Sequence, residues 1–553
     1  MNTSQNIPTI YNINQKIKDG FVQIEKWRKL FNIQNRIYQS KAIRWCLAKE
    51  QGFHASFDSD NKIKKLVSTK KTGLVADEMG LGKTFVMLGT WVGNFKKNTL
   101  IVLPSALLHQ WAKLIKKFLG FEPLVFHGYK SKTPIDKIKQ SHIVLTTYGM
   151  ISPRPKNKKR KTTWSSPLWE IQWDRLILDE AHHVRNTFSN KHKGIAKLKS
   201  EITWFITGTP IQNSGRDLIS LCKLMGFYDE MLENPKKVVE ILRKYTLMRT
   251  KKQVGIDMEP IENITINIDK YDSPEEEKLI RDIHSMLSFT NVTVENVDAA
   301  ISFLKGDSPL PLLVRSRQVC VAPTILSRHL RKLIGLGEIP ADINWKPCQT
   351  NTKLRIITET AANIRKDGRI LMFCHYMQEM NTLKQMLTEK GLTVKMMNGN
   401  TKLKERKFIG LPFINDGDWG KIFANSKLEK KTDILKNLIM PMLEPDVLLV
   451  QIQSCCEGLN LQQFNNVFFT SPHWNPAVED QAICRAHRLG QKKKVKVYKF
   501  ITKINSEYNG GDDNCPGVIS LDKYCNNVQE KKREAMQQFA RDTSMEERCD
   551  VPE

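Results

Sequence analysis

The stretch GLVADEMGLGKT places two glycines, a lysine and a hydroxyl residue at close spacing. Gly80 and Gly82 let the backbone turn so that several N–H groups point inward, where they can bind phosphate. Lys83 would reach the β and γ phosphates, and Thr84 would offer its hydroxyl to Mg²⁺. Asp77 stands where the pattern G-x-x-x-x-G-K-[ST] has its first glycine, so an ordinary surface turn is the alternative.

Two adjacent carboxylates, Asp179 and Glu180, directly follow the apolar run Leu176–Leu178. A buried strand ending in carboxylates presents them at the edge where open α/β sheets bind ligands. Asp179 would hold Mg²⁺, and Glu180 would orient and deprotonate an attacking water. A pair that merely caps the next helix is the alternative. The roughly one hundred residues between Lys83 and this pair leave room for strand–helix units that would bring both to one nucleotide cleft.

Three other polar groups could complete such a site. Gln39 lies upstream of the loop, and its amide could pair with an adenine edge or simply be exposed on a helix. Arg485 and Arg488 are three residues apart, so we expect them on one helix face with Gln481 one turn earlier. Two guanidinium groups can neutralise charge that develops on a γ-phosphate, while a plain surface pair is the alternative.

Apolar strands alternate with helical stretches on both sides of a mostly helical middle. This alternation predicts an α/β fold with doubly wound parallel sheets. Strands are expected in the first half at 100–103, 124–126, 143–146, 176–178 and 204–207, and in the second at 370–373, 394–397, 447–450, 467–469 and 495–500. Between 213 and 351, where Arg249 and Arg315 could be polar braces or phosphate contacts, the pattern favours an inserted helical segment.

Composition favours a polyanionic partner. The 553 residues carry 86 basic and 58 acidic side chains, a net charge of +28, which suits nucleic acid or reflects solubilising lysines. The length suits two or three domains. No apolar run is long enough for a membrane helix, and the start lacks the apolar core of a signal peptide, so we expect an intracellular protein. Eleven cysteines without a C-x-x-C pair suggest neither zinc nor disulfides.

Together the motifs resemble those of the Swi/Snf-related helicase-like ATPases of the second helicase superfamily. The resemblance covers residues 36–505. The motif sequences are most similar to those of the branch that contains helicase-like transcription factor and its DNA-repair relatives. The stretches that carry it are DEMGLGKT, ILDEAHHVRN, TGTPIQN, EGLNLQ and SPHWNPAVEDQAICRAHRLGQ.

This resemblance implies two RecA-like lobes with MgATP between them, double-stranded DNA across both, and movement along DNA without strand separation. Residue by residue it makes Gln39 an adenine contact, Asp77 to Thr84 the phosphate loop, and Asp179 and Glu180 the metal and water pair. It places Gln481 beside the γ-phosphate and makes Arg485 and Arg488 arginine fingers. The expected segments are a lead-in (1–35), the first lobe (36–250), a helical linker (251–350), the second lobe (351–508) and a tail (509–553).

The chain departs from the family's pattern in three ways. Cys455 and Cys456 replace two glycines before GLNL, which restricts the backbone where DNA contact is coupled to ATP. The repair branch carries a zinc-binding RING, which this chain lacks, so ubiquitin ligation is not expected. Residues 401–428 resemble an insertion without an assigned function. With no space for a chromatin-reading module, the chain resembles the compact motors of large DNA viruses.

The leading hypothesis is therefore a DNA-dependent ATPase that moves on duplex DNA and displaces or remodels nucleosomes, transcription or repair proteins, or DNA structures. A strand-separating RNA or DNA helicase and a nucleic-acid-binding scaffold with a decayed ATP site are the alternatives. The basic run 153–161 could be a nuclear localisation signal, a DNA-backbone contact or a solvated loop. The nucleus, or a viral replication compartment or virion, is the expected location.

Overall fold

The computed structural model describes most of the chain. The described residues are 10–57, 63–68, 70–128, 133–153, 165–210, 216–287, 309–340, 346–401, 445–455, 461–488, 490–504 and 518–543. They form two compact units: one comprises Met1–Asp257 with Lys532–Glu553, and the other Met258–Lys531.

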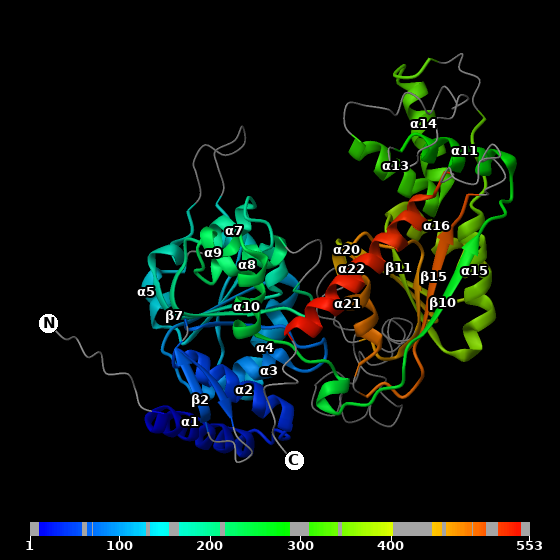
Figure 1. The fold of residues 1–553 in the computed structure, drawn as a ribbon. Coiled ribbons are helices and arrows are strands. Elements are labelled where there is room, and N and C mark those ends of the chain that lie inside the picture. The colour runs from blue at the N-terminus through cyan, green and yellow to red at the C-terminus, as the bar shows by residue number, and fades with distance from the viewer. Residues whose placement is uncertain are drawn as a thin grey trace. The chain divides into compact units, whose positions relative to one another are not determined.

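The first unit is built on a sheet whose strands all run parallel, in the order β5-β6-β4-β7-β8-β3-β9 (Figure 1). Its strands are β3 (Thr72–Val75), β4 (Thr99–Leu103), β5 (Leu124–Phe126), β6 (Ile143–Thr147), β7 (Gln172–Asp179), β8 (Lys199–Ile206) and β9 (Thr246–Leu247). A separate antiparallel pair joins β1 (Phe53–Phe57) to β2 (Ile63–Ser68).

Helices cover both faces of this sheet, as a doubly wound fold requires. One core packs against α1 (Ile10–Leu30), α2 (Ile37–Glu50), α3 (Lys83–Gly93) and α4 (Leu108–Leu119). The other face is covered by α5 (Ile135–Gln140), α6 (Tyr148–Ile151), α7 (Asn190–Ile195), α8 (Arg216–Leu224), α9 (Asp229–Leu232) and α10 (Pro235–Tyr245). Because both faces are buried, a strand such as β4 is buried at every position and almost wholly apolar, without alternation.

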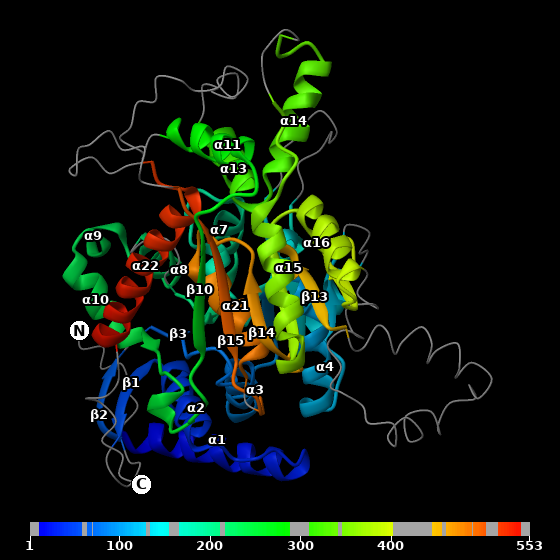
Figure 2. The same ribbon diagram turned by 90° about the vertical axis from the view of Figure 1, so that its right-hand side faces the viewer.

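The second unit has its own parallel sheet, in the order β10-β15-β14-β11-β13-β12 (Figure 2). Its strands are β10 (Glu262–Ile268), β11 (Arg369–Cys374), β12 (Val394–Met397), β13 (Val447–Gln451), β14 (Phe464–Phe469) and β15 (Lys496–Thr502). The two sheets confirm the predicted α/β fold with two doubly wound lobes.

The helices of the second unit belong to three groups. Helices α15 (Thr352–Ile364) and α16 (Met377–Glu389) pack on one face of the sheet, and α21 (Pro476–Ala486) packs on the other. Helices α11 (Pro274–Ser285), α13 (Pro309–Val321) and α14 (Pro323–Gly335) share a core of their own. The short α20 (Ile452–Cys455) follows β13.

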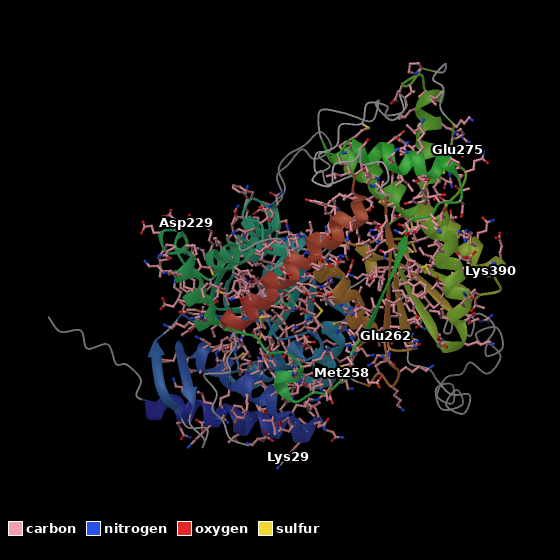
Figure 3. All side chains as sticks on the ribbon, turned by 45° about the vertical axis from the view of Figure 1, so that its right-hand side comes forward. Lys29, Asp229, Met258, Glu262, Glu275 and Lys390 are labelled. Atoms are coloured by element: carbon pink, nitrogen blue, oxygen red, sulfur yellow. The ribbon has the colours of Figure 1, made fainter. Side chains whose placement is uncertain are left out.

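Strand β10 differs from the expectation that residues 251–350 form a helical linker. It begins at Glu262, labelled in Figure 3, and pairs in parallel with β15 along its whole length. Its side chains alternate between partly buried and exposed, the pattern of an edge strand with one covered face. The partner strand β15 lies more than two hundred residues later in the chain, so β10 is not evident from its helical sequence neighbours.

The tail also contains a structured element. Helix α22 (Leu521–Thr543) lies within the segment 509–553 that was expected as a tail, and Leu521 and Cys525 are buried in a cluster with Cys320. Its residues up to Lys531 belong to the second unit.

Some sequence features lie outside the described residues. These are most of the basic run 153–161, the expected insertion from 402 onwards, Cys456 with the start of EGLNLQ, 211–213 of TGTPIQN, and 509–517 of the tail. Among the described helices, none is long and apolar enough to cross a membrane. The described side chains likewise contain no cluster of three or more His, Cys, Asp or Glu suited to a metal ion.

Candidate active site

The phosphate loop joins the end of β3 to the start of α3 and depends on two glycines. Gly80 and Gly82 have φ angles of +96° and +82°, in the left-handed region that favours glycine. At Gly82 a β-carbon would also lie 2.4 Å from Nε2 of Gln39. Glycine at position 82 is therefore favoured by its backbone conformation, and a larger residue would also displace the Gln39 amide.

Lys83 is the first residue of α3, with Thr84 beside it on the first turn. Its Nζ donates hydrogen bonds to the carbonyl oxygens of Asp77 at 2.7 Å and Glu78 at 3.4 Å. A β-carbon added to Gly208 would lie 3.3 Å from the same Nζ. The amine therefore lies between its own loop and the segment after β8.

Asp179 ends β7, and its carboxylate is buried and hydrogen-bonded on both oxygens. Oδ2 accepts from the indole N–H of Trp111 at 2.7 Å, and Oδ1 accepts from the backbone N–H of Glu180 at 2.9 Å. Burial, and then the neighbouring charge of Glu180, raise the pKa of Asp179 to about 7, although Lys83 acts in the opposite direction. A buried carboxyl group of this kind gains from a cation bound beside it.

Glu180 takes up a strained backbone conformation. Its φ and ψ of 50° and 52° are left-handed, which costs a non-glycine residue about 1–3 kcal/mol. Its carboxylate lies 3.4 Å from Nδ1 of His182, which also contacts the Thr207 hydroxyl at 3.3 Å. Thr207 in turn accepts the backbone N–H of Thr209 at 3.1 Å. The residues after β7 and β8 thus form one hydrogen-bonded group.

Strand order explains why these groups meet. Strand β8 pairs with β7 on one side and with β3 on the other, all in parallel. The segments that leave their carboxyl ends therefore lie at one edge, the usual ligand edge of such sheets. This edge presents a lysine, a glycine loop in the left-handed conformation, a helix start and paired carboxylates. These groups fit a phosphorylated ligand with a divalent cation.

Gln39 and Asp77 take positions that the motif alone did not predict. Gln39 is buried on α2, and its Nε2 donates to the carbonyl oxygen of Leu81 at 3.1 Å, so its amide already contacts the phosphate loop. The carboxylate of Asp77 is buried and forms a bidentate ion pair with Arg249. The charge of Asp77 is therefore balanced by Arg249.

In the second unit, Gln481 and Arg485 lie on α21, one turn apart. Both are buried, and neither Nε2 of Gln481 nor Nε of Arg485 has a hydrogen-bond partner among the described residues. A buried guanidinium N–H without a partner is costly. Such groups are suited to an anionic ligand that supplies the acceptor.

Arg488 is not on the same helix as Arg485, so the expectation of one shared helix face is wrong. Helix α21 ends at Ala486, and the C-cap residue His487 has a ψ of 81°, which turns the chain out of the helix. Nε of Arg488 instead donates to the carbonyl oxygen of Cys484 at 2.8 Å. Burial, followed by the charge of Arg485, lowers the pKa of Arg488 to about 10.

Two residues of the site, Trp111 and Tyr148, were not predicted from the sequence, and Arg249 was predicted only as a polar brace or a phosphate contact. Trp111 donates to Asp179 from helix α4, and the Tyr148 hydroxyl donates to the backbone oxygen of Asp179 at 2.7 Å. Arg249 holds Asp77 from a position 172 residues away. An indole or arginine that donates to a carboxylate far away in the sequence leaves no local sequence pattern. The only indirect signal was that a carboxylate at the end of a buried strand needs hydrogen-bond donors.

The fold and this edge together define a nucleotide-binding α/β protein with a second lobe of related architecture. Residues 38–325 match the model of the SNF2-related domain, and residues 352–490 match the helicase conserved C-terminal domain. The chain belongs to the SNF2-related family and is a helicase-like ATPase, as the motifs predicted.

Relatives include viral and cellular proteins. The "Probable global transactivator" of Orgyia pseudotsugata multicapsid polyhedrosis virus is 27% identical over 448 residues, which are 78% of this chain and 81% of that protein. Human helicase-like transcription factor is 24% identical over 75% of this chain and 49% of its own length. DNA repair protein rad8 of Schizosaccharomyces pombe is 23% identical over 86% of this chain and 58% of its own length.

The chain thus spans most of the viral relative and about half of the two cellular ones. Among solved structures, a Sulfolobus solfataricus SWI2/SNF2 ATPase core in complex with dsDNA is 18% identical. The alignment covers 94% of this chain and 98% of that chain at a TM-score of 0.33, which is too low to transfer function.

Proposed function

We propose that this protein is an ATP-dependent translocase on double-stranded DNA that displaces or remodels bound proteins or DNA structures. The observation that carries the proposal is the meeting of Lys83, the Asp179–Glu180 pair and the Thr207–Thr209 segment at one edge of a parallel sheet. Family membership implies nucleotide use. The net charge of +28 supports a polyanionic partner, and the name of the rad8 relative supports DNA.

In this proposal each group has one task. The phosphate loop and Lys83 bind the β and γ phosphates, while Thr84 and Asp179 hold Mg²⁺. ATP supplies the γ-phosphoryl group, and Mg²⁺ supplies the positive charge that offsets its oxygens. Glu180 orients and deprotonates the attacking water, and its left-handed backbone, which is costly for a non-glycine residue, supports a functional role.

The remaining groups bind the base and stabilise the transition state. Gln39 contacts the adenine edge next to the loop. Arg485 and Arg488 neutralise charge on the γ-phosphoryl group, and the buried amide of Gln481 takes part beside them. Duplex DNA is held through its backbone by basic and hydroxyl side chains, so binding is independent of sequence and weakened by salt.

The targets follow from this activity. A motor of this kind would act on nucleosomes or on transcription or repair proteins bound to DNA. It would work in the nucleus or in a viral replication compartment, where such DNA lies.

Steady-state ATP hydrolysis tests the proposal directly. We would compare reactions with no nucleic acid, duplex DNA, single-stranded DNA and RNA at two salt concentrations, with Lys83→Ala and Glu180→Gln as inactive controls. We expect strong stimulation by duplex DNA that salt weakens and both variants abolish. Stimulation by RNA or single strands alone would favour a strand-separating helicase, and rates equal to those of the variants would favour a nucleic-acid-binding scaffold.

A further inference from the structure

Residues 247–251, which we name the clamp segment, continue the pairing of β3 with β9 beyond the end of β3. The backbone N–H of Ala76 donates to the carbonyl oxygen of Leu247 at 2.7 Å. Two residues later, the N–H of Glu78 donates to the carbonyl oxygen of Arg249 at 2.9 Å. The first residues of the phosphate loop are therefore fixed like an added length of strand.

Arg249 of the clamp segment fixes the loop a second time through its side chain. Its Nε and Nη2 donate to the two carboxylate oxygens of Asp77 at 3.1 and 2.6 Å. The Asp77 side chain is 1% exposed and that of Arg249 is 13% exposed, so solvent screens this pair little. Bidentate geometry fixes orientation as well as distance.

The same guanidinium also reaches the adenine-binding candidate. Nη1 of Arg249 donates to the backbone oxygen of Tyr38 at 2.7 Å. Tyr38 precedes Gln39, whose amide donates to the carbonyl oxygen of Leu81 within the phosphate loop. A closed chain of contacts thus runs from the clamp segment through the loop to Gln39 and back.

Lys251, the last residue of the clamp segment, binds the next acidic residue of the loop, Glu78. Its Nζ lies 3.1 Å from Oε1 of Glu78, and its backbone N–H donates to Oε2 of the same carboxylate at 2.8 Å. Its methylene chain passes 3.6 Å from the position that a β-carbon on Gly80 would occupy. Two consecutive acidic residues of the loop are thus each held by a basic residue of the clamp segment.

We propose that Arg249 is a positioning residue of the ATPase, which sets the phosphate loop and Gln39 in the nucleotide-binding arrangement before nucleotide arrives. From the sequence, Arg249 could be either a polar brace or a phosphate contact. The three hydrogen bonds of its guanidinium group to Asp77 and Tyr38 favour the role of a brace. A glycine-containing loop has many accessible conformations. If the loop is ordered before nucleotide binds, less of the binding free energy is needed to order it. The inference rests on the proposed nucleotide site.

The test measures nucleotide affinity separately from turnover in the full chain. Binding of the fluorescent analogue mant-ATP with Mg²⁺ would be titrated without DNA, and KM and kcat for ATP would be measured with saturating duplex DNA. For Arg249→Ala we expect Kd and KM to rise about tenfold or more, with kcat at saturating ATP changed less. Arg249→Lys keeps the charge without the fork and should recover only part of the affinity.

Lys71→Ala is the matched control, since it breaks the Lys71–Glu201 ion pair at the amino end of the neighbouring strands. Its nucleotide affinity should equal wild type. If Arg249→Ala fails to fold, Arg249→Lys decides. A folded Arg249 variant whose Kd and KM match those of the Lys71→Ala control overturns the inference. A wild-type chain that binds no mant-ATP refutes the proposed function itself.

Discussion

Trp111 shows how a residue without a reactive group can shape the candidate metal site. Its indole N–H is one of two donors on the Asp179 carboxylate, and partners of this kind orient metal-binding side chains. The ring is itself buried on α4, so its position is determined by packing rather than by solvent.

We expect Trp111→Phe to raise the Mg²⁺ concentration for half-maximal ATP hydrolysis by about tenfold, because Asp179 loses a fixed donor. Trp173→Phe is the control: that indole is equally buried but donates to the carbonyl oxygen of Leu168, away from the site. Both variants should lose similar stability. An unchanged Mg²⁺ requirement in Trp111→Phe would show that the hydrogen bond has no part in metal binding.

Arg485 permits a sharper test, since its guanidinium Nε is buried without a partner among the described groups. If it stabilises the transferring phosphoryl group, Arg485→Lys should lower kcat by about 10³ while nucleotide affinity stays near wild type. Arg355→Lys alters an exposed arginine of α15 and should leave kcat unchanged. Equal rates in the two variants, measured with duplex DNA, would remove Arg485 from the catalytic set.

At the scale of elements, the part of α22 up to Lys531 is an integral part of the second unit. Asp522 accepts from Lys353 Nζ and Ser471 Oγ, both at 2.5 Å, and from the Thr502 backbone at 3.1 Å. Gln529 donates to the backbone oxygen of His473 at 2.6 Å. The helix is therefore bonded to the segment that leads into α21 and its arginine.

Asp522→Ala should destabilise the protein by roughly 3–5 kcal/mol, because Lys353 is left buried without its counter-ion. Unfolding in urea, followed by circular dichroism, measures the loss. Glu359→Ala breaks an exposed pair with Arg355 on α15, which is worth only about 0–1 kcal/mol. Comparable losses in both variants would mean that α22 adds little to the second unit.

At the scale of the whole molecule, two buried histidines make stability depend on pH. Burial lowers the pKa of His284 to about 4, and burial, then the charge of Arg317, lowers the pKa of His375 to about 3. Both stay neutral in the folded protein, whereas the unfolded chain takes up protons near pH 6.5. The unfolded state then binds more protons, so stability is complete above about pH 6.5 and falls on acidification.

Urea unfolding at pH 8, 6.5 and 5 should therefore show a progressive loss below pH 6.5, on the order of 1.4 kcal/mol per pH unit for each histidine. His284→Gln should flatten this dependence, whereas His142→Gln, at an exposed position of the first unit, should leave it as in wild type. A dependence that is equally steep in both variants would assign the acid sensitivity to other groups.

The sequence predicted most of the architecture and supplied the candidate residues of the site. Nearly all predicted strands lie within a few residues of the observed ones, because strands buried on both faces must be continuous apolar runs. The phosphate loop was readable because its glycines, lysine and threonine are local. Strand β10 and the start of α22 were not, since both are set by partners distant in the chain.

Tertiary structure alone decided how the chemical groups are held. Nothing near Asp77 indicates Arg249, and nothing near Asp179 indicates Trp111, because these partners lie 172 and 68 residues away. A buried carboxylate must find a donor wherever the fold brings one, and that choice depends on which strands and helices become neighbours. The sequence by itself named the groups that would act on a nucleotide, and the packed sheet determined which other side chains keep them in place.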